Sequence, residues 1–291
     1  MLYIHPEGGL CNRIFAIDAT RQLCSELGVE YGIIWKNNAE CACNFEDIFS
    51  IGKDNVKNIL LAKRRFRENL KEYGIAKAVI ERAYSYKNAD YLDRYKIRLD
   101  ITKNDTYDPA ELMLKIKNLL NEEKICINTY FQYYGETDIT EEIFSRPVLE
   151  RARARRKEYG HYVALHIRRT DHIKCIRENP IDEYFEKKIV EEIANDPAVK
   201  IYIATDDTGV YDLFLKRYRD NIIELTDIQR SRLSKEGIQD AVCELLILAG
   251  AERIYGSRGS TFTDVACLLH KKLTEDSDRS NMSDISGSSV P

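Results

Sequence analysis

The sequence lacks the features that mark a membrane protein or a secreted, disulfide-stabilised domain. No run of about 18 apolar residues occurs, so no transmembrane segment is expected. The first five residues enter a strand pattern directly, without the basic and apolar regions of a signal peptide. We therefore expect a cytoplasmic protein, or a soluble catalytic domain separated from an anchor.

Cysteine is sparse, with 8 residues in a chain of 291. Cys24, Cys126, Cys243 and Cys267 lie inside apolar runs, where a thiol packs as a small hydrophobic group. The pair in residues 41–43 (CAC) is spaced too tightly for a zinc knuckle, and no second Cys/His pair follows at a metal-binding interval. Reduced thiols and no metal cofactor are expected.

No charge of one sign dominates, because 44 basic residues oppose 48 acidic ones and the net charge is −4. A field of that size would not draw the whole protein onto nucleic acid or an anionic membrane. Any anion must therefore be bound at a local site. The segment from Thr274 to the end is rich in Ser and Asp and poor in apolar residues, so we expect it to be disordered.

A chain of 291 residues is long enough for two domains. Its first half begins with an α/β pattern. A strand at 2–5, a glycine turn, a helix ended by Gly28 and a strand at 29–35 form a βαβ unit. A helix at 109–121 and a strand at 125–131 follow, whereas 53–90 gives no convincing strand. We place the N-terminal domain at 1–150 and expect helix 149–159 to connect it to the next.

The second half alternates strands and helices from Gly160 onward. Four successive βα units predict a doubly wound parallel sheet in a Rossmann-like domain at 151–273. Ligands of such sheets bind at the carboxyl ends of the strands, and two α/β domains place them in a cleft. The predicted strands are 162–167, 199–205, 221–225 and 252–256, and the predicted helices are 181–195, 208–218, 236–249 and 260–271.

The motif 166–171 (HIRRTD) begins with the last two residues of the predicted strand 162–167, and Arg168 to Asp171 follow the strand directly. Guanidinium groups at the end of a buried parallel strand can chelate phosphate oxygens in bidentate fashion, and Asp171 can orient one of them. A surface ion-pair cluster is the alternative. The candidates here are His166, Arg168, Arg169 and Asp171.

Two more strand ends carry polar residues. Asp206 and Asp207 follow strand 199–205, where one acid suffices to cap the next helix and the other suits a ribose or purine hydrogen bond. A metal-binding acidic pair is the alternative. The turn 256–262 (GSRGSTF) opens a helix and forms either an anion site or a simple cap. Its candidates are Ser257, Ser260, Thr261 and Phe262.

The N-terminal turn 7–13 (EGGLCNR) carries the fourth group of candidates. Adjacent Gly8 and Gly9 let the backbone approach a ligand closely, and Asn12 and Arg13 lie in the first helical turn. The turn lacks the third glycine of a dinucleotide fingerprint and the Lys-Ser/Thr of a P-loop. We expect Arg13 to reach across the cleft to a phosphate or sugar.

The order GGLxNR, HIRRTD, ATDD and SRGSTF resembles the fucosyltransferase superfamily, which includes α-1,6-fucosyltransferases and protein O-fucosyltransferases. The resemblance covers most of 160–270, including 179–185 (NPIDEYF), and a short N-terminal patch. It implies a GT-B fold, two Rossmann-like domains facing a cleft. It also implies metal-independent, inverting transfer of fucose from GDP-fucose to a glycan or other hydroxyl acceptor, with the acceptor on the side of domain 1–150.

The resemblance also implies roles for single residues. Arg168 would hold the β-phosphate, supported by Arg169 and Arg13, and His166 would set the guanine or arginine geometry. Asp206 or Asp207 would meet the ribose or guanine, and Ser260, Thr261 and Phe262 would line the phosphate and sugar.

The general base is less well defined by the resemblance. The family's candidate maps loosely onto Glu178, because the loop from Asp171 to Pro180 is shorter than in the family. Two alternatives to fucose transfer stay open. One is a glycosyltransferase that uses another nucleotide sugar, and the other is a non-catalytic nucleotide- or glycan-binding module.

Overall fold

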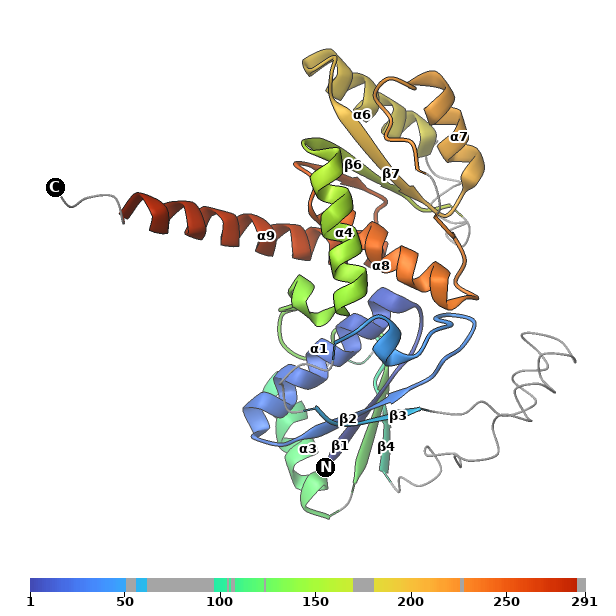
Figure 1. The fold of residues 1–291 in the computed structure, drawn as a ribbon. Helices are drawn as coiled ribbons and strands as arrows, with labels where there is room; N and C mark the ends of the chain where they lie inside the picture. Colours follow the sequence, from blue (N-terminus) through green and yellow to red (C-terminus); the bar gives the residue numbers. More distant parts are fainter. Residues whose placement is uncertain are drawn as a thin grey trace, which may run out of the picture. The chain divides into compact units, whose positions relative to one another are not determined.

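The protein is described by a computed structural model over residues 1–50, 56–61, 97–103, 105, 108–122, 124–169, 181–225 and 228–286. Two compact units are present. Unit 1 comprises Met1–Ile139 and Ser231–Gln239, and unit 2 comprises Thr140–Arg230 and Asp240–Pro291. Both are α/β units built on parallel sheets (Figure 1).

Unit 1 is built on a five-stranded parallel sheet in the order β3-β2-β1-β5-β4. The residues of β1, β2 and β5 are buried throughout, which is why these strands read as nearly continuous apolar runs. Helix α1 packs against β1 and β2. The elements are β1 Leu2–Pro6, α1 Leu10–Leu27, β2 Tyr31–Trp35, β3 Val56–Leu61, β4 Ile97–Asp100, α3 Pro109–Glu122 and β5 Ile125–Thr129.

Helix α1 ends where the sequence predicts. Gly28 adopts a left-handed conformation with φ of 65°, and its N–H bonds back into the last turn. The N–H of Val29 donates to the carbonyl of Cys24 over 3.0 Å, which completes a glycine cap. A residue with a Cβ would be strained at this position.

A short segment from late in the chain completes unit 1. The N–H of Ala42 donates to the carbonyl of Arg232 over 3.1 Å. Asp47 is held from the same segment, since Lys235 pairs with its carboxylate at 2.7 Å and the Gln239 amide donates to its carbonyl at 2.9 Å. Unit 1 is therefore discontinuous in sequence.

Unit 2 is built on a three-stranded parallel sheet in the order β7-β6-β8. Strands β6 and β7 pack against α6 and α7 through apolar side chains that include Leu165, Ile203, Phe185 and Phe214. The elements of this half are α4 Arg146–Tyr159, β6 Tyr162–Ile167, α6 Ile181–Asn195, β7 Lys200–Thr205, α7 Thr208–Arg217, α8 Lys235–Ala249, β8 Ile254–Gly256 and α9 Thr261–Ser286, of which Lys235–Gln239 belongs to unit 1.

The predicted strand 221–225 is wrong, because only an isolated bridge between Ile201 and Ile222 forms there. The segment leaves the sheet after two backbone bonds to Ile201. The Tyr211 hydroxyl then accepts from the N–H of Leu225 at 2.7 Å, in place of a strand partner. A side chain from α7 thus binds a backbone N–H group that a longer strand would use to pair with its neighbour.

Within the tail predicted to be disordered from Thr274, the backbone of α9 continues as a helix to Ser286, and 287–291 lie outside the described residues. The hydroxyl of Thr274 donates within the helix, to the carbonyls of His270 and Lys271. No glycine or proline interrupts 274–286, and Gly287 follows directly. Low apolar content argues against core packing, but it does not by itself prevent a helix.

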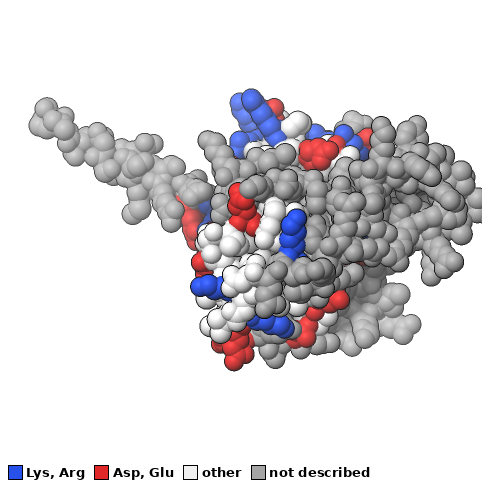
Figure 2. Space-filling model, turned by 90° about the horizontal axis from the view of Figure 1, so that it is seen from below, with Lys and Arg blue, Asp and Glu red and all other residues white. Residues whose placement is uncertain are grey.

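The basic helix α4 lies within unit 2, where several of its arginines pair with acidic side chains. Glu141 is buried and accepts hydrogen bonds from Arg153 and Arg156, the latter over 2.7 Å. Lys and Arg side chains also occur beside Asp and Glu on the face that Figure 2 presents. The mixture of basic and acidic side chains agrees with their nearly equal numbers in the sequence.

Candidate functional site

The three strands of unit 2 end at one edge of the sheet and bring three predicted motifs together. In the register, Ile167 of β6 lies beside Thr205 of β7, and His166 lies beside Gly256 of β8. The residues that follow these strands therefore converge, because parallel strands place their carboxyl ends at the same edge. This edge is the candidate site.

Backbone hydrogen bonds fix the start of the arginine motif. The N–H of Arg168 donates to the Ser257 hydroxyl over 3.0 Å, and Ser257 donates from both its N–H and its hydroxyl to the carbonyl of His166. The N–H of Arg169 donates to the Asp206 carboxylate over 2.8 Å. Side chains from the two neighbouring strand ends thus hold the main chain of both arginines.

The two aspartates have different roles, which the sequence left open. Asp207 caps α7, because its carboxylate accepts from the N–H groups of Gly209 and Val210. Its other oxygen lies 3.7 Å from Nε of Arg169, whose side chain is 23% exposed. Asp206 is the acid that binds the arginine backbone. We infer that Asp206 positions the motif and that Asp207 orients the guanidinium of Arg169.

His166 is buried, and its imidazole is neutral at physiological pH. Burial, assisted by the charge of Arg168, lowers its pKa to about 4. The hydroxyl of Thr263 donates to the Ser257 carbonyl at 3.2 Å, so it must accept the 2.7 Å hydrogen bond from Nδ1 of His166. Nε2 is therefore the unprotonated nitrogen. The ring lies against Phe262, with centroids 4.8 Å apart.

Thr263 is a site residue that the sequence analysis missed. Its side chain links His166 to the 256–262 turn, and it also explains Gly256, where an added Cβ would lie 2.1 Å from the Thr263 methyl group. The signal in the sequence was weak, because Thr263 looks like an ordinary residue of a first helical turn.

The turn before α9 offers a buried polar group. Ser260 is 1% exposed, and its hydroxyl has no hydrogen-bond partner among the described residues. Its carbonyl accepts from the N–H of Asp264, so the backbone rather than the hydroxyl starts the helix. Thr261 and Phe262 follow as half-buried residues. Free N–H groups at a helix start, together with an unused hydroxyl, suit an anionic or polyhydroxyl ligand.

The N-terminal glycine turn lies in unit 1. Gly8 has a positive φ of 77°, and a Cβ there would lie 2.7 Å from the half-buried Asn12 amide nitrogen. Gly9 is extended and precedes the first residue of α1. The turn is thus closed by its own helix, and its glycines are required by conformation.

Arg13 is fully buried within unit 1, and its expected role toward a phosphate or sugar stays a prediction. It donates to the carbonyl of Gly8 at 2.8 Å, to the carbonyl of Lys36 at 2.6 Å and to the side chain of Asn38 at 2.6 Å. It also stacks over Trp35, with 4.6 Å between Cζ and the ring centroid. We assign it to holding the glycine turn against the end of β2.

Other predicted features are settled only in part. Asp171 and Glu178 lie outside the described residues, so their predicted roles stay predictions. Within the described ranges, no group of three or more His, Cys, Asp or Glu side chains is arranged to hold a metal ion. No helix in the same ranges has the length and apolar character to span a membrane. No disulfide joins the cysteines in the described part of the chain.

Comparison with known proteins decides the fold. The NodZ α-1,6-fucosyltransferase soaked with GDP-fucose superposes with a TM-score of 0.55 at 14% identity, covering 92% of each chain. The chain has a fucosyltransferase-like fold. NodZ from Bradyrhizobium gives 0.55 at 14% identity, with 92% and 91% covered, and POFUT1 in complex with GDP gives 0.54 at 13%, with 92% and 93% covered. No family model and no curated sequence matches the chain.

This fucosyltransferase-like fold confirms the resemblance that the motif order indicated. The motifs of the second half meet at one sheet edge of unit 2, whereas Gly8, Gly9, Asn12 and Arg13 belong to unit 1. The strongest candidate residues are therefore the arginines and the residues that hold them. The full set at this edge is His166, Arg168, Arg169, Asp206, Asp207, Ser257, Ser260, Thr261, Phe262 and Thr263.

Proposed function

We propose that this protein is an inverting glycosyltransferase that transfers fucose from GDP-fucose to a glycan or other hydroxyl acceptor, without a metal ion. The observation that carries the proposal is the pair of arginines at the end of β6, whose backbone is held from both neighbouring strand ends. Solved structures of similar fold include a NodZ α-1,6-fucosyltransferase with GDP-fucose or with GDP, and POFUT1 with GDP. That similarity supports a nucleotide-sugar donor.

The proposed chemistry requires the charge that grows on the leaving diphosphate to be neutralised. The acceptor oxygen attacks an oxocarbenium-like anomeric carbon from the opposite face as the sugar–phosphate bond breaks. Arg168 would hold the β-phosphate, and Arg169, oriented by Asp207, would add a second cation. Preorganised groups of this kind typically contribute ~10²–10³ in rate.

The remaining residues would bind the donor by hydrogen bonds and packing. His166 is neutral, so it does not oppose the arginines, and its unprotonated Nε2 can accept a hydrogen bond from guanine or from an arginine. The unused hydroxyl of Ser260 can donate to a phosphate or sugar oxygen. Thr261 and Phe262 begin the helix beside it and would line the sugar.

Donor binding tests this proposal directly. We expect GDP and GDP-fucose to raise the melting temperature, because a ligand that binds only the folded state stabilises it by mass action. The shift should persist in EDTA and should be smaller for UDP-sugars. A shift that needs Mg²⁺ or Mn²⁺ would reassign Asp206 and Asp207 as metal ligands, and no shift with any nucleotide would refute the proposal.

The same screen separates the two alternatives. A larger shift with GDP-mannose or a UDP-sugar than with GDP-fucose would indicate another donor, because arginines recognise phosphate rather than the base or the sugar. Binding without GDP release, in water or with an acceptor panel, would indicate a non-catalytic module. Arg219→Lys is the matched control for variants of the arginine motif, since Arg219 is exposed beyond α7.

A further inference from the structure

The turn between β8 and α9 carries an arginine outside the set named above. Arg258 lies between Ser257, whose hydroxyl accepts from the N–H of Arg168, and Gly259. It is exposed, and no hydrogen bond or ion pair joins it to another residue in the described part of the chain. Arg258 and the arginine motif both belong to unit 2, so one compact unit contains them.

Hydrogen bonds on both sides of Ser257 fix the backbone from which Arg258 extends. The N–H and the hydroxyl of Ser257 donate to the carbonyl of His166 at 3.0 and 3.2 Å. The hydroxyl of Thr263 donates to the Ser257 carbonyl at 3.2 Å. The Arg258 side chain therefore begins next to the end of β6, where the arginine motif starts.

The backbone just after Arg258 is accessible to a ligand. Gly259 has a left-handed φ of 69°, and a Cβ added to it would meet no heavy atom of the described residues within 4 Å. The first N–H groups of α9 follow, and N–H groups at a helix start have no partner within their own helix. Ser260 adds its unused hydroxyl. An anion at this turn would meet backbone donors beside the guanidinium of Arg258.

The acidic residues at this edge leave the charge of Arg258 unbalanced. Asp206 accepts from the N–H of Arg169, and Asp207 caps α7 and lies 3.7 Å from Nε of Arg169. Arg258 has no such carboxylate partner among the described residues. The edge thus presents a positive charge in addition to those of the arginine motif.

The proposed reaction creates a negative charge that this cation can balance. The diphosphate of a nucleotide sugar carries one charge on each phosphate, and Arg168 and Arg169 match these two. When the sugar is transferred, the β-phosphate becomes a terminal phosphate, whose second proton has a pKa of about 6 and is lost at neutral pH. Free GDP therefore carries about one more negative charge than GDP-fucose. An exposed arginine without an ion-pair partner suits this additional charge.

We propose that Arg258 binds the β-phosphate of the departing GDP, an inference that rests on the proposed function. The acceptor oxygen bonds to the anomeric carbon, and the bond from that carbon to the phosphate oxygen breaks, leaving its electron pair on that oxygen. The proton of the acceptor hydroxyl passes to the general base, for which Glu178 is the predicted residue. The Arg258 guanidinium donates to the oxygen that gains the charge, and Arg168 holds the same phosphate before and after transfer.

The test compares two ligands that differ in this charge, GDP and GDP-fucose. Arg258→Gln removes the cation, and Arg258→Lys keeps the charge without the fork. Calorimetry measures both affinities, and GDP release from GDP-fucose is followed with water alone and with an oligosaccharide panel. Arg219→Gln is the matched control, because Arg219 is exposed beyond α7. Thermal unfolding without ligand checks that each variant folds.

We expect Arg258→Gln to weaken GDP binding about tenfold and to slow GDP release from GDP-fucose about tenfold, because a hydrogen bond between charged groups is lost. Its affinity for GDP-fucose should change less than about twofold, and Arg258→Lys should recover part of both losses. Equal effects on the binding of GDP and GDP-fucose, or no effect on either, would overturn the inference and leave the proposed function intact. A wild type that binds neither ligand would overturn both.

Discussion

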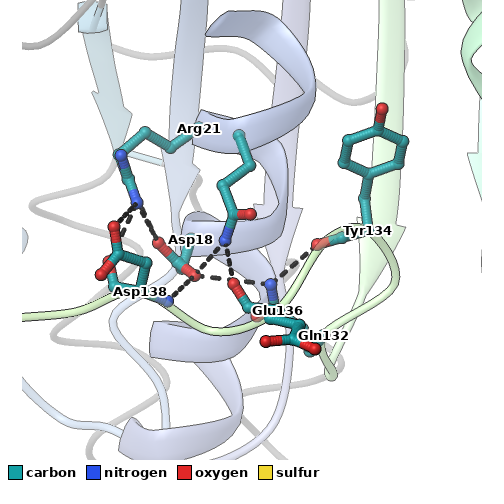
Figure 3. A network of polar contacts seen from close by, with 7 residues as sticks. Asp18, Arg21, Gln132, Tyr134, Glu136 and Asp138 are labelled. Atoms are coloured by element: carbon teal, nitrogen blue, oxygen red, sulfur yellow. Dashed lines mark hydrogen bonds and ion pairs between the residues drawn. The ribbon is translucent and has the colours of Figure 1, made fainter. Parts of the chain in front are cut away.

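Replacing Asp18 by alanine removes the buried carboxylate that joins α1 to the loop after β5. The carboxylate accepts two hydrogen bonds from Arg21, at 3.1 and 2.8 Å, one from Gln22 at 2.8 Å and one from the N–H of Asp138 at 3.0 Å (Figure 3). Gln132 adds a longer contact of 3.4 Å. The Asp18 side chain is only 3% exposed, so water cannot easily replace these contacts.

The loss of stability in Asp18→Ala depends on which hydrogen-bond donors keep another partner. Arg21 is 33% exposed and also donates to the Asp138 carbonyl, so losing the Asp18 carboxylate costs less at this partner. Gln22 retains the Glu136 carbonyl at 2.6 Å, whereas the N–H of Asp138 loses the carboxylate. With ~1.5–3 kcal/mol for each buried bond to a charged group, we expect unit 1 to lose ~3–4 kcal/mol.

Trp35 makes this measurement specific to unit 1. It is the single tryptophan of the chain and is buried in β2, so its fluorescence in a urea titration reports that unit alone. Asp18→Asn should fall between alanine and the wild type, because one oxygen remains. Glu150→Ala is the control, since its pair with Arg146 is exposed on α4. A loss below about 1 kcal/mol for Asp18→Ala would refute the reasoning.

Other predictions concern the site in unit 2. Arg168→Lys should lower the transfer rate by ~10²-fold or more and weaken GDP binding, because lysine lacks the bidentate fork of arginine. Arg169→Lys should have a smaller effect. Equal losses of transfer rate in the two variants would contradict their separate roles. Glu178→Gln should lower the transfer rate without changing donor affinity if Glu178 is the general base, and an unchanged rate would assign the base to another group. The pKa of His166 is depressed to about 4, so its contribution to stability is present above pH 6.5 and is lost as the pH falls toward 4. Between pH 6.5 and 4 the buried imidazole should lower the free energy of unfolding by about 3 kcal/mol, and His166→Gln should remove this loss. Thermal unfolding at a series of pH values measures it, and the same loss in the variant would contradict a neutral buried imidazole.

The sequence predicted what depends on local patterns. Buried parallel strands such as β1 and β6 are continuous apolar runs, and Gly28 ends α1 because its left-handed conformation has a simple sequence signature. The convergence of the motifs at 166, 206 and 257 followed from the rule that parallel strands end at one edge. These inferences needed no knowledge of side-chain packing.

What the sequence did not reveal depends on contacts between distant residues. Nothing near Ile223 reveals that the hydroxyl of Tyr211 captures the following backbone and ends the strand pairing. Nothing near Arg13 reveals that Trp35 and Asn38 surround its guanidinium. The sequence pattern indicates only a strand residue at His5, because its partner Asn128 lies far along the chain. A polar residue in a buried strand was the signal that could have found it.

The discontinuity of unit 1 has a consequence for how the protein is synthesised. The segment that binds Ala42 and Asp47 lies at 231–239, so a ribosome must complete most of the sequence of unit 2 before unit 1 receives its last piece. Unit 1 therefore remains incomplete until residues 231–239 have been synthesised. A truncated gene ending at residue 139 would give a product that exposes the surface around Asp47, and joining 231–239 to it through a linker should restore solubility.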